Sequence, residues 1–167
     1  MHRYDVVVIG GGIAGSALAA ALAPAGLDVL VLERVTEFRD KVRGEYMQPW
    51  GAVEMLQMGL DDVLLAAGGG WCRRIISYGD DIDPGAAESG AIPLDAMIPG
   101  IPGSFNVGHP QASEALNIAA ATRGATVLRD VTDVEVSVGS EPSVRYSHDG
   151  MVHDVECRLI VGADGRQ

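Results

Sequence analysis

Positive charge is scarce in this sequence. Lys41 is its single lysine, and twelve basic residues face 23 aspartates and glutamates, which gives a formal net charge of −11 at pH 7. Proteins that bind the phosphate backbone of nucleic acids carry basic stripes, and no such stripe occurs here. We therefore expect no nucleic-acid partner, and the acidity is typical of a well-solvated surface.

Cysteines and long apolar runs are scarce as well. Cys72 and Cys157 stand far apart and match no metal-binding or redox spacing, so we expect no metal site and reduced thiols in a cytoplasmic protein. No apolar run approaches the ~20 residues that cross a bilayer, so no membrane partner is expected. The N-terminus does not predict a secretory signal, because Asp5 and three consecutive glycines interrupt its apolar stretch.

Apolar residues, in contrast, are plentiful. They make up 47% of the 167 residues, which argues against disorder. A chain of this length fits one domain of ordinary size, which buries roughly 70% of its unfolded surface and needs no disulfide or metal to hold its core.

The most informative segment spans residues 4–33. An apolar strand at 4–9 leads into a glycine cluster, an alanine-rich helix, a second apolar strand at 27–32 and a terminal acid, Glu33. The first strand is too apolar for a half-exposed position, so we expect it in the middle of a parallel sheet with helices on both faces. This order of elements is the dinucleotide-binding fingerprint in its expected context.

Each glycine of the cluster has an expected role. Gly10 lets the chain turn tightly, Gly12 lets the backbone approach a pyrophosphate, and Gly15 lets the helix pack closely on the strand. Ile13 and Ala14 open the helix, whose free N–H groups and positive end face the phosphates.

Glu33 follows the second strand, where a carboxylate can accept hydrogen bonds from the hydroxyls of an adenosine ribose. A carboxylate there repels a 2′-phosphate, so NADP is not the expected occupant of this site. The alternative is a glycine-rich turn with a purely structural role, because such turns are common.

The remaining elements depart from a simple NAD-binding domain. Such a domain continues as alternating strands and helices, whereas this sequence predicts an antiparallel meander that favours a flavin-binding variant. An Asp-Gly pair at 149–150 is a strong hairpin signal within the meander. We expect helices at 49–58, 61–67 and 110–123, strands at 71–78, 104–107, 125–129, 131–138, 143–147, 151–156 and 158–161, and a long loop at 79–102.

Three motifs, which together span the whole chain, resemble those of the FAD-dependent aromatic hydroxylases, the flavoprotein monooxygenases that include p-hydroxybenzoate hydroxylase. The first is the glycine turn together with Glu33 and Arg34. The second is the segment 43–49, which begins with Arg43. The third is the sequence Gly-Ala-Asp-Gly at 162–165.

The resemblance implies roles for individual residues. Arg34 would lie beside the adenosine, Arg43 would face the cofactor, and Asp164 and Gly165 would form a fingerprint that serves both FAD and a passing nicotinamide cofactor. His109 stands where relatives commonly carry arginine or glutamine that touches the ribityl and phosphate region.

Structural roles stay open for several of these residues. Arg34 and Arg43 also suit an exposed surface, and Asp164 also suits a turn at the end of a strand. Val134 could line the adenine pocket, and it equally suits a buried strand of the meander.

The predicted fold class is therefore α/β: a Rossmann-like FAD-binding domain with a parallel sheet plus a three-stranded antiparallel meander, and part of a substrate-domain sheet. We expect the FAD-binding domain at 1–70 and 108–167 and a partial substrate-domain insertion at 71–107. The third FAD motif of the family, a later Gly-Asp pair, is absent, so we expect the N-terminal portion of a longer enzyme.

The resemblance implies an enzyme in which NADH or NADPH, as a transient reductant, reduces FAD, and the reduced flavin uses O₂ to hydroxylate an aromatic or polyketide-like small molecule. The alternatives are a truncated, catalytically inactive nucleotide-binding module and another member of the flavin superfamily, such as a halogenase or a prenyl reductase. Halogenases rely on a lysine near the substrate, and no lysine follows Lys41. Besides the substrate, the expected partners are the missing C-terminal portion or a second copy of the chain. The sequence predicts no catalytic acid or base.

Overall fold

The computed structural model describes residues 2–40 and 46–165. The chain divides into two compact units, one formed by Met1–Lys41 with His109–Gln167 and the other by Val42–Gly108. The domain boundaries expected above, with a substrate-domain insertion at 71–107, stay a prediction. Within the described residues, none of the helices has the length and apolar character that a bilayer crossing requires.

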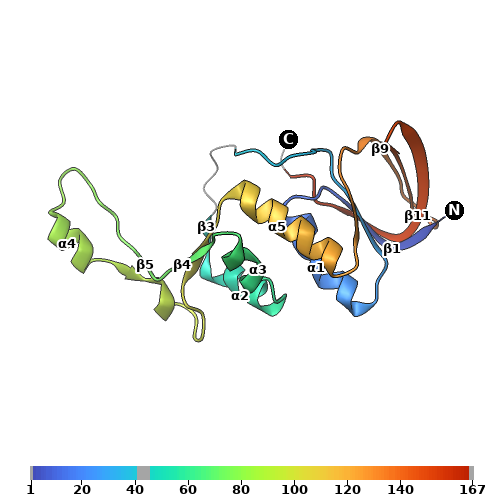
Figure 1. Cartoon of the computed structure of the whole chain (residues 1–167). Helices are drawn as coiled ribbons and strands as arrows, with labels where there is room; N and C mark the ends of the chain where they lie inside the picture. Colours follow the sequence, from blue (N-terminus) through green and yellow to red (C-terminus); the bar gives the residue numbers. More distant parts are fainter. Residues whose placement is uncertain (1, 41–45, 166–167) are drawn as a thin grey trace. The chain divides into compact units, whose positions relative to one another are not determined.

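The described part of the first unit is built on a six-stranded sheet with the order β8-β2-β1-β11-β10-β9 (Figure 1). Strands β8, β2, β1 and β11 run parallel, whereas β10 pairs antiparallel with both β11 and β9. A parallel sheet extended by a three-stranded meander is the predicted architecture, so the α/β fold class is confirmed. The strands are β1 (Arg3–Ile9), β2 (Val29–Leu32), β8 (Thr126–Leu128), β9 (Thr132–Ser137), β10 (Ser143–His148) and β11 (Met151–Gly162).

Strand β2 and the middle of β1 are covered on both faces, as their apolar runs predict. All four residues of β2 are buried. On β1, Val7 joins the core under the meander, whereas Val8 points to the opposite face, where it lies close to Gly15 of helix α1 (Ile13–Leu22). A 3₁₀ turn at Ala23–Ala25 ends α1 and leads to β2.

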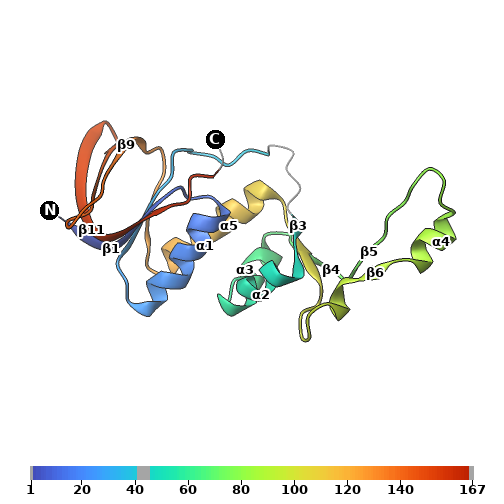
Figure 2. The same ribbon diagram turned by 180° about the vertical axis from the view of Figure 1, so that it is seen from behind.

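Helix α1 lies beside α5 (His109–Thr122), as Figures 1 and 2 show from opposite sides. Both helices bury alanines, among them Ala20 of α1 and Ala120 of α5, neither of which is exposed. Small side chains let two helices approach closely, so the alanine-rich sequences fit this packing. The helix predicted at 110–123 begins one residue earlier and ends one residue earlier than expected.

Strand β11 corrects one prediction. The sequence predicted separate strands at 151–156 and 158–161, but Met151–Gly162 is one continuous strand. Its first half pairs with β10 and its second half with β1. No glycine or proline lies between the two halves, and Cys157 at their junction is buried, so nothing interrupts the strand. As a result, β11 joins the meander to the parallel sheet.

One cluster of core residues in the first unit joins the parallel strands to the meander. Tyr4, Leu128, Val134 and Ile160 are partly buried and pack against this cluster. For Val134 this is the packing role that the sequence had left open. The cluster consists of Val7, Leu30, Leu32, Val131, Val144, Tyr146, Val155 and Cys157.

The second unit contains two small antiparallel sheets, of order β3-β7-β4 and β5-β6. Phe105 of β7 is fully buried and meets Trp71 of β4 edge to face, with 5.1 Å between the ring centres. The elements are β3 (Tyr46–Met47), α2 (Pro49–Gln57), α3 (Asp61–Ala66), β4 (Gly70–Cys72), β5 (Arg74–Ile75), α4 (Pro84–Ser89), β6 (Ile92–Pro93), a 3₁₀ turn (Leu94–Ala96) and β7 (Ser104–Asn106).

Two predictions for this unit were wrong. The strand expected at 71–78 is interrupted after Cys72, and the segment 79–102 is not a loop throughout, because it contains α4, β6 and a 3₁₀ turn. The start of α4 was encoded locally: Asp83 caps the helix by accepting a hydrogen bond of 3.1 Å from the Ala86 N–H, and Pro84 occupies the first turn.

Candidate cofactor-binding site

The glycine turn follows β1 at the carboxyl edge of the parallel strands, where ligands of open α/β sheets bind. Gly10 has φ +104°, and a Cβ at this position would lie 2.5 Å from the Ala163 carbonyl oxygen. Ala163 in turn donates its N–H to the Ile9 oxygen at 2.7 Å. The glycine turn and the Gly-Ala-Asp-Gly segment are therefore in direct contact. Any residue other than glycine at position 10 would be strained and would clash with Ala163.

Gly15 allows a second close approach. A Cβ there would run into the Gly10 carbonyl oxygen and would lie 3.0 Å from a methyl carbon of Val8. The first turns of α1 can therefore pack directly against the glycine turn and β1.

The N-terminus of α1 is open to an anion. Gly12 is its N-cap, with φ −69° and ψ −168°, and no side chain caps the helix within the described part of the chain. A Cβ on Gly12 would meet no described atom within 4 Å. Ile13 and Ala14 follow as the first helical residues, and the first turn carries no acidic side chain. Free N–H groups, the positive end of the helix and open space are what a phosphate group requires.

Glu33 contacts the glycine turn, and its side chain makes more hydrogen bonds within the protein than the sequence suggested. The residue is only 8% exposed. Its Oε2 accepts a hydrogen bond of 2.5 Å from the Gly11 N–H, and its Oε1 accepts one of 2.8 Å from the Val35 N–H. Since a carboxylate has about four acceptor positions, the two remaining lone pairs can still accept ribose hydroxyls. Glu33 thus also ties the glycine turn to the segment that follows β2.

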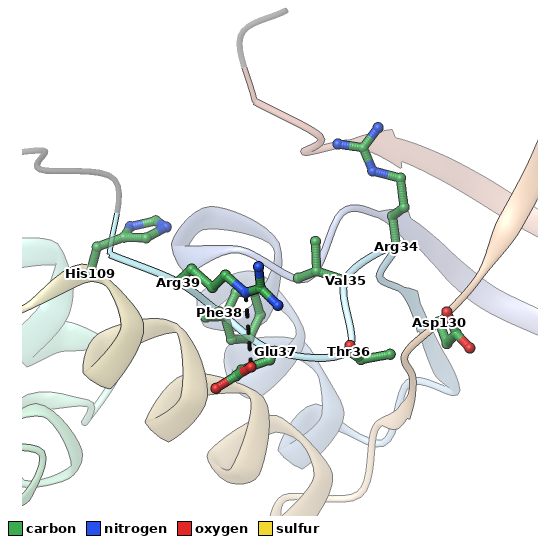
Figure 3. Close-up of a pocket in the computed structure, with 8 residues that line it drawn as sticks. All are labelled: Arg34, Val35, Thr36, Glu37, Phe38, Arg39, His109 and Asp130. Atoms are coloured by element: carbon green, nitrogen blue, oxygen red, sulfur yellow. Dashed lines mark ion pairs between the residues drawn. The ribbon is translucent and has the colours of Figure 1, made fainter.

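That segment lines a cavity of about 330 Å³ in the first unit (Figure 3). The cavity brings together two of the predicted binding residues, Arg34 and His109, although they lie far apart in the sequence. Arg34 and Asp130 stand on one side of it, and Arg39 and His109 on the other (Figure 3). Its lining consists of Arg34, Val35, Thr36, Glu37, Phe38, Arg39, His109 and Asp130.

The remaining predicted residues lie elsewhere. Asp164 and Gly165 are exposed directly after β11, and the Asp164 nitrogen would be 2.7 Å from a Cβ on Gly10. Val134 lies on β9 and packs against the core of the first unit; its contact with adenine stays a prediction. Arg43 lies outside the described residues.

Sequence reasoning missed three polar residues behind the glycine turn. Ser16 and Asn117 both donate hydrogen bonds to the Gly11 carbonyl oxygen, at 2.7 and 2.5 Å, and Arg129 donates to the Asn117 side chain at 3.3 Å. The available signal was weak: two polar residues on alanine-rich helices whose neighbours are apolar. Since buried polar groups need partners, this pattern indicates a buried network but does not identify its members.

Comparison with known proteins agrees with this geometry. A family described as an FAD binding domain matches residues 3–167. Squalene epoxidase erg1 of Schizosaccharomyces pombe is 42% identical over 77 residues, which are 46% of this chain and 17% of that enzyme.

Two solved structures share the fold over nearly the whole chain. OxyS anhydrotetracycline hydroxylase from Streptomyces rimosus is 27% identical with a TM-score of 0.76, and the match covers 98% of this chain and 32% of that one. The myxobacterial chondrochloren halogenase CndH is 26% identical with a TM-score of 0.79, over 99% of this chain and 38% of that one. The chain therefore spans well under half the length of the proteins it matches.

Proposed function

The chain belongs to the FAD binding domain family of flavin-dependent monooxygenases, and from this premise we propose that it is the FAD-binding portion of an NAD(P)H-dependent enzyme. This enzyme hydroxylates an aromatic or polyketide-like small molecule. The observation that carries the proposal is the open, uncapped N-terminus of α1. Glu33 lies next to it and accepts a hydrogen bond from the Gly11 N–H. Hydroxylases in the manner of p-hydroxybenzoate hydroxylase are the subtype we propose.

The residues of the first unit fit the parts of FAD. Backbone N–H groups of Gly12, Ile13 and Ala14 would bind the diphosphate, because they are donors at the positive end of a helix. Glu33 would accept hydrogen bonds from the adenosine ribose with its two remaining lone pairs. Arg34 and His109, which share one cavity, would contact the adenosine and the phosphate region.

When bound, the flavin supplies the electron transfer and the oxygen activation. The contribution of this chain is to bind and orient the cofactor. NADH or NADPH as a transient reductant, a small-molecule substrate and a cytoplasmic location are parts of the same proposal. Asp164 would serve both FAD and the reductant at the end of β11.

A titration of the purified chain with FAD, followed by flavin fluorescence and absorbance, tests the binding. We expect one FAD per chain. Gly12→Asp should abolish binding without unfolding the protein, because its Cβ enters open space and its carboxylate repels the diphosphate. Gly70→Asp is the matched control, since Gly70 also has open space around its Cβ and no positive φ. Wild-type protein that takes up no FAD would overturn the proposal.

A second candidate, halogenation, is supported by the similarity to the chondrochloren halogenase. The two candidates predict different products from FAD-loaded protein supplied with NADH or NADPH and an aromatic substrate. A hydroxylase adds oxygen whether or not halide is present, whereas a halogenase requires halide. FAD-loaded protein that oxidises no NAD(P)H would instead favour a nucleotide-binding module that is inactive by itself.

A further inference from the structure

Asn117 is a buried polar residue on the alanine-rich helix α5. It is 3% exposed. Its Nδ2 lies 2.5 Å from the backbone oxygen of Gly11, 2.7 Å from Ser16 Oγ and 3.0 Å from the backbone oxygen of Ser113. An amide buried in this way is costly unless it is hydrogen-bonded, so its partners determine whether it stabilises the fold. One of these partners belongs to the glycine turn.

Gly11 is held on both of its polar groups. Its N–H donates to Glu33, and its carbonyl oxygen accepts from Ser16 of α1 and from Asn117 of α5. The two helices thus fix the carbonyl from one side, and the carboxylate fixes the N–H.

Fixing this carbonyl has a consequence for the next residue. In a planar trans peptide the carbonyl oxygen and the following N–H point in opposite directions. Because the Gly11 oxygen points to Ser16 and Asn117, the Gly12 N–H points away from them. Gly12 also adjoins open space. The hydrogen bonds to the Gly11 carbonyl oxygen therefore direct the Gly12 N–H toward the proposed diphosphate position.

The orientation of the Asn117 amide is itself fixed. Arg129 donates from Nε to Asn117 Oδ1 at 3.3 Å and from Nη2 to Glu114 Oε2 at 2.7 Å. Its guanidinium carbon also lies 4.8 Å from the centre of the Phe38 ring. A flipped amide would place its oxygen against the Gly11 oxygen and its NH₂ against the guanidinium, so the network specifies which end of Asn117 faces the turn.

We propose that Asn117 is a positioning residue for the cofactor diphosphate: through the Gly11 carbonyl it holds the Gly12 N–H in the direction that FAD binding requires. The inference rests on the proposed function. Asn117 contacts no cofactor itself and acts through the backbone of the glycine turn. Ser16 has the same role from the other helix.

The test compares Asn117→Asp and Ser16→Ala with the wild-type chain. Asn117→Asp keeps the size of the side chain but replaces the donor with an oxygen that repels the Gly11 carbonyl, whereas Ser16→Ala removes one donor. We expect the Kd for FAD and for ADP to rise roughly tenfold or more in Asn117→Asp and about threefold in Ser16→Ala. Ser113→Ala is the matched control, because Ser113 is equally buried on the same helix and its Oγ has no hydrogen-bond partner among the described residues.

A second readout separates positioning from general destabilisation. Amide hydrogen exchange at Gly10 and Gly11, whose N–H groups are hydrogen-bonded, should become faster in Asn117→Asp and Ser16→Ala, whereas exchange in β10 should keep its wild-type rate. Ser113→Ala should leave both segments unchanged.

The possible outcomes are distinct. Equal acceleration in the glycine turn and in β10 would overturn the inference, as would unchanged affinity in Ser16→Ala and Asn117→Asp when the wild type binds FAD. If Asn117→Asp fails to fold, Ser16→Ala decides the question by the same two readouts. A wild-type chain that binds neither FAD nor ADP overturns the proposed function, and this inference with it.

Discussion

Gly11 and Glu33, 22 positions apart in the sequence, are joined by a hydrogen bond of 2.5 Å from the backbone N–H to Oε2. The other carboxylate oxygen accepts from the Val35 N–H at 2.8 Å. The same side chain that we propose as the ribose ligand is therefore a structural link between the glycine turn and the segment after β2.

Glu33→Gln should weaken both the fold and FAD binding. A carboxamide has a single acceptor oxygen, so its NH₂ group must face one of the two backbone donors, which leaves a buried donor unsatisfied. The expected loss is about 1–3 kcal/mol in the free energy of unfolding, measured by urea denaturation, together with a higher Kd for FAD. Glu37→Gln is the control for the stability measurement, since the Glu37 side chain is 76% exposed and its ion pair with Arg39 is long, at 3.9 Å. Equal stability of the two variants would contradict the structural role of Glu33.

Gly10→Ala tests the contact between the glycine turn and Ala163. The new Cβ would lie 2.5 Å from the Ala163 oxygen at φ +104°. Gly26→Ala provides a comparison, because Gly26 also has a positive φ, +82°, but no described atom lies within 4 Å of its Cβ. Both variants should lose stability through backbone strain, and Gly10→Ala should lose about 1–3 kcal/mol more through the clash. Thermal or urea unfolding measures this difference, and losses of the same size would show that the two segments are not in contact.

The pH dependence of stability should show the contribution of the ionised Asp5 side chain to the free energy of unfolding. The Asp28 N–H, which donates to its carboxylate, and secondly the Arg158 guanidinium lower the pKa of Asp5 below its ordinary value of 3.8. Since the folded pKa is lower than the unfolded pKa, the contribution of Asp5 is complete above the unfolded value and is lost as the pH falls through the folded value. Asp5→Asn should therefore show a smaller loss of stability below about pH 4 than the wild type.

This effect is measured by denaturant midpoints across the acid range. Asp81→Asn, in an exposed turn of the second unit, serves as the control and should follow the wild-type curve. If Asp5→Asn also followed the wild-type curve, the hydrogen bonds to Asp5 would carry no stability.

The two cysteines should differ in reactivity. Burial raises the pKa of the Cys157 thiol, and the residue is only 1% exposed, whereas Cys72 is half-buried. The thiolate is the reactive form, so iodoacetamide near pH 8 should modify Cys72 first and Cys157 only after unfolding. Mass spectrometry of peptides after timed quenching identifies the site, and Cys72→Ser should remove the early adduct. Early modification of Cys157 would contradict the placement of this residue in the core.

Much of the first unit could be predicted because its signals are local. The apolar runs of β1 and β2, the glycines between them and the Asp-Gly pair at 149–150 each specify a strand or a turn within a few residues. The continuity of β11 could not be predicted with the same rules, because a strand that changes partners from β10 to β1 is indistinguishable in sequence from two adjacent strands. Its partners are decided by tertiary packing.

The positions of the candidate site residues in the fold were predictable to a similar extent. Gly10, Gly15 and Glu33 follow a known spacing, so their places in the fold followed from the sequence. The second role of Glu33 and the role of Asn117 depend on residues that meet across long sequence separations, such as the hydrogen bond between Asn117 and Gly11 over 106 positions. A single sequence holds no information on such pairs beyond the presence of a polar residue among alanines.

Strand β11 sets the distance between the two segments that it joins. It is twelve residues long and has no break, so the distance from the hairpin at Asp149 to the exposed Asp164 is fixed by one extended backbone. A slip of one residue against β10 would reverse every side chain of the strand and would move Asp164 by one position relative to the glycine turn. Insertions or deletions in the hairpin itself are absorbed by the turn, whereas the same changes within the strand would displace a proposed ligand at its far end.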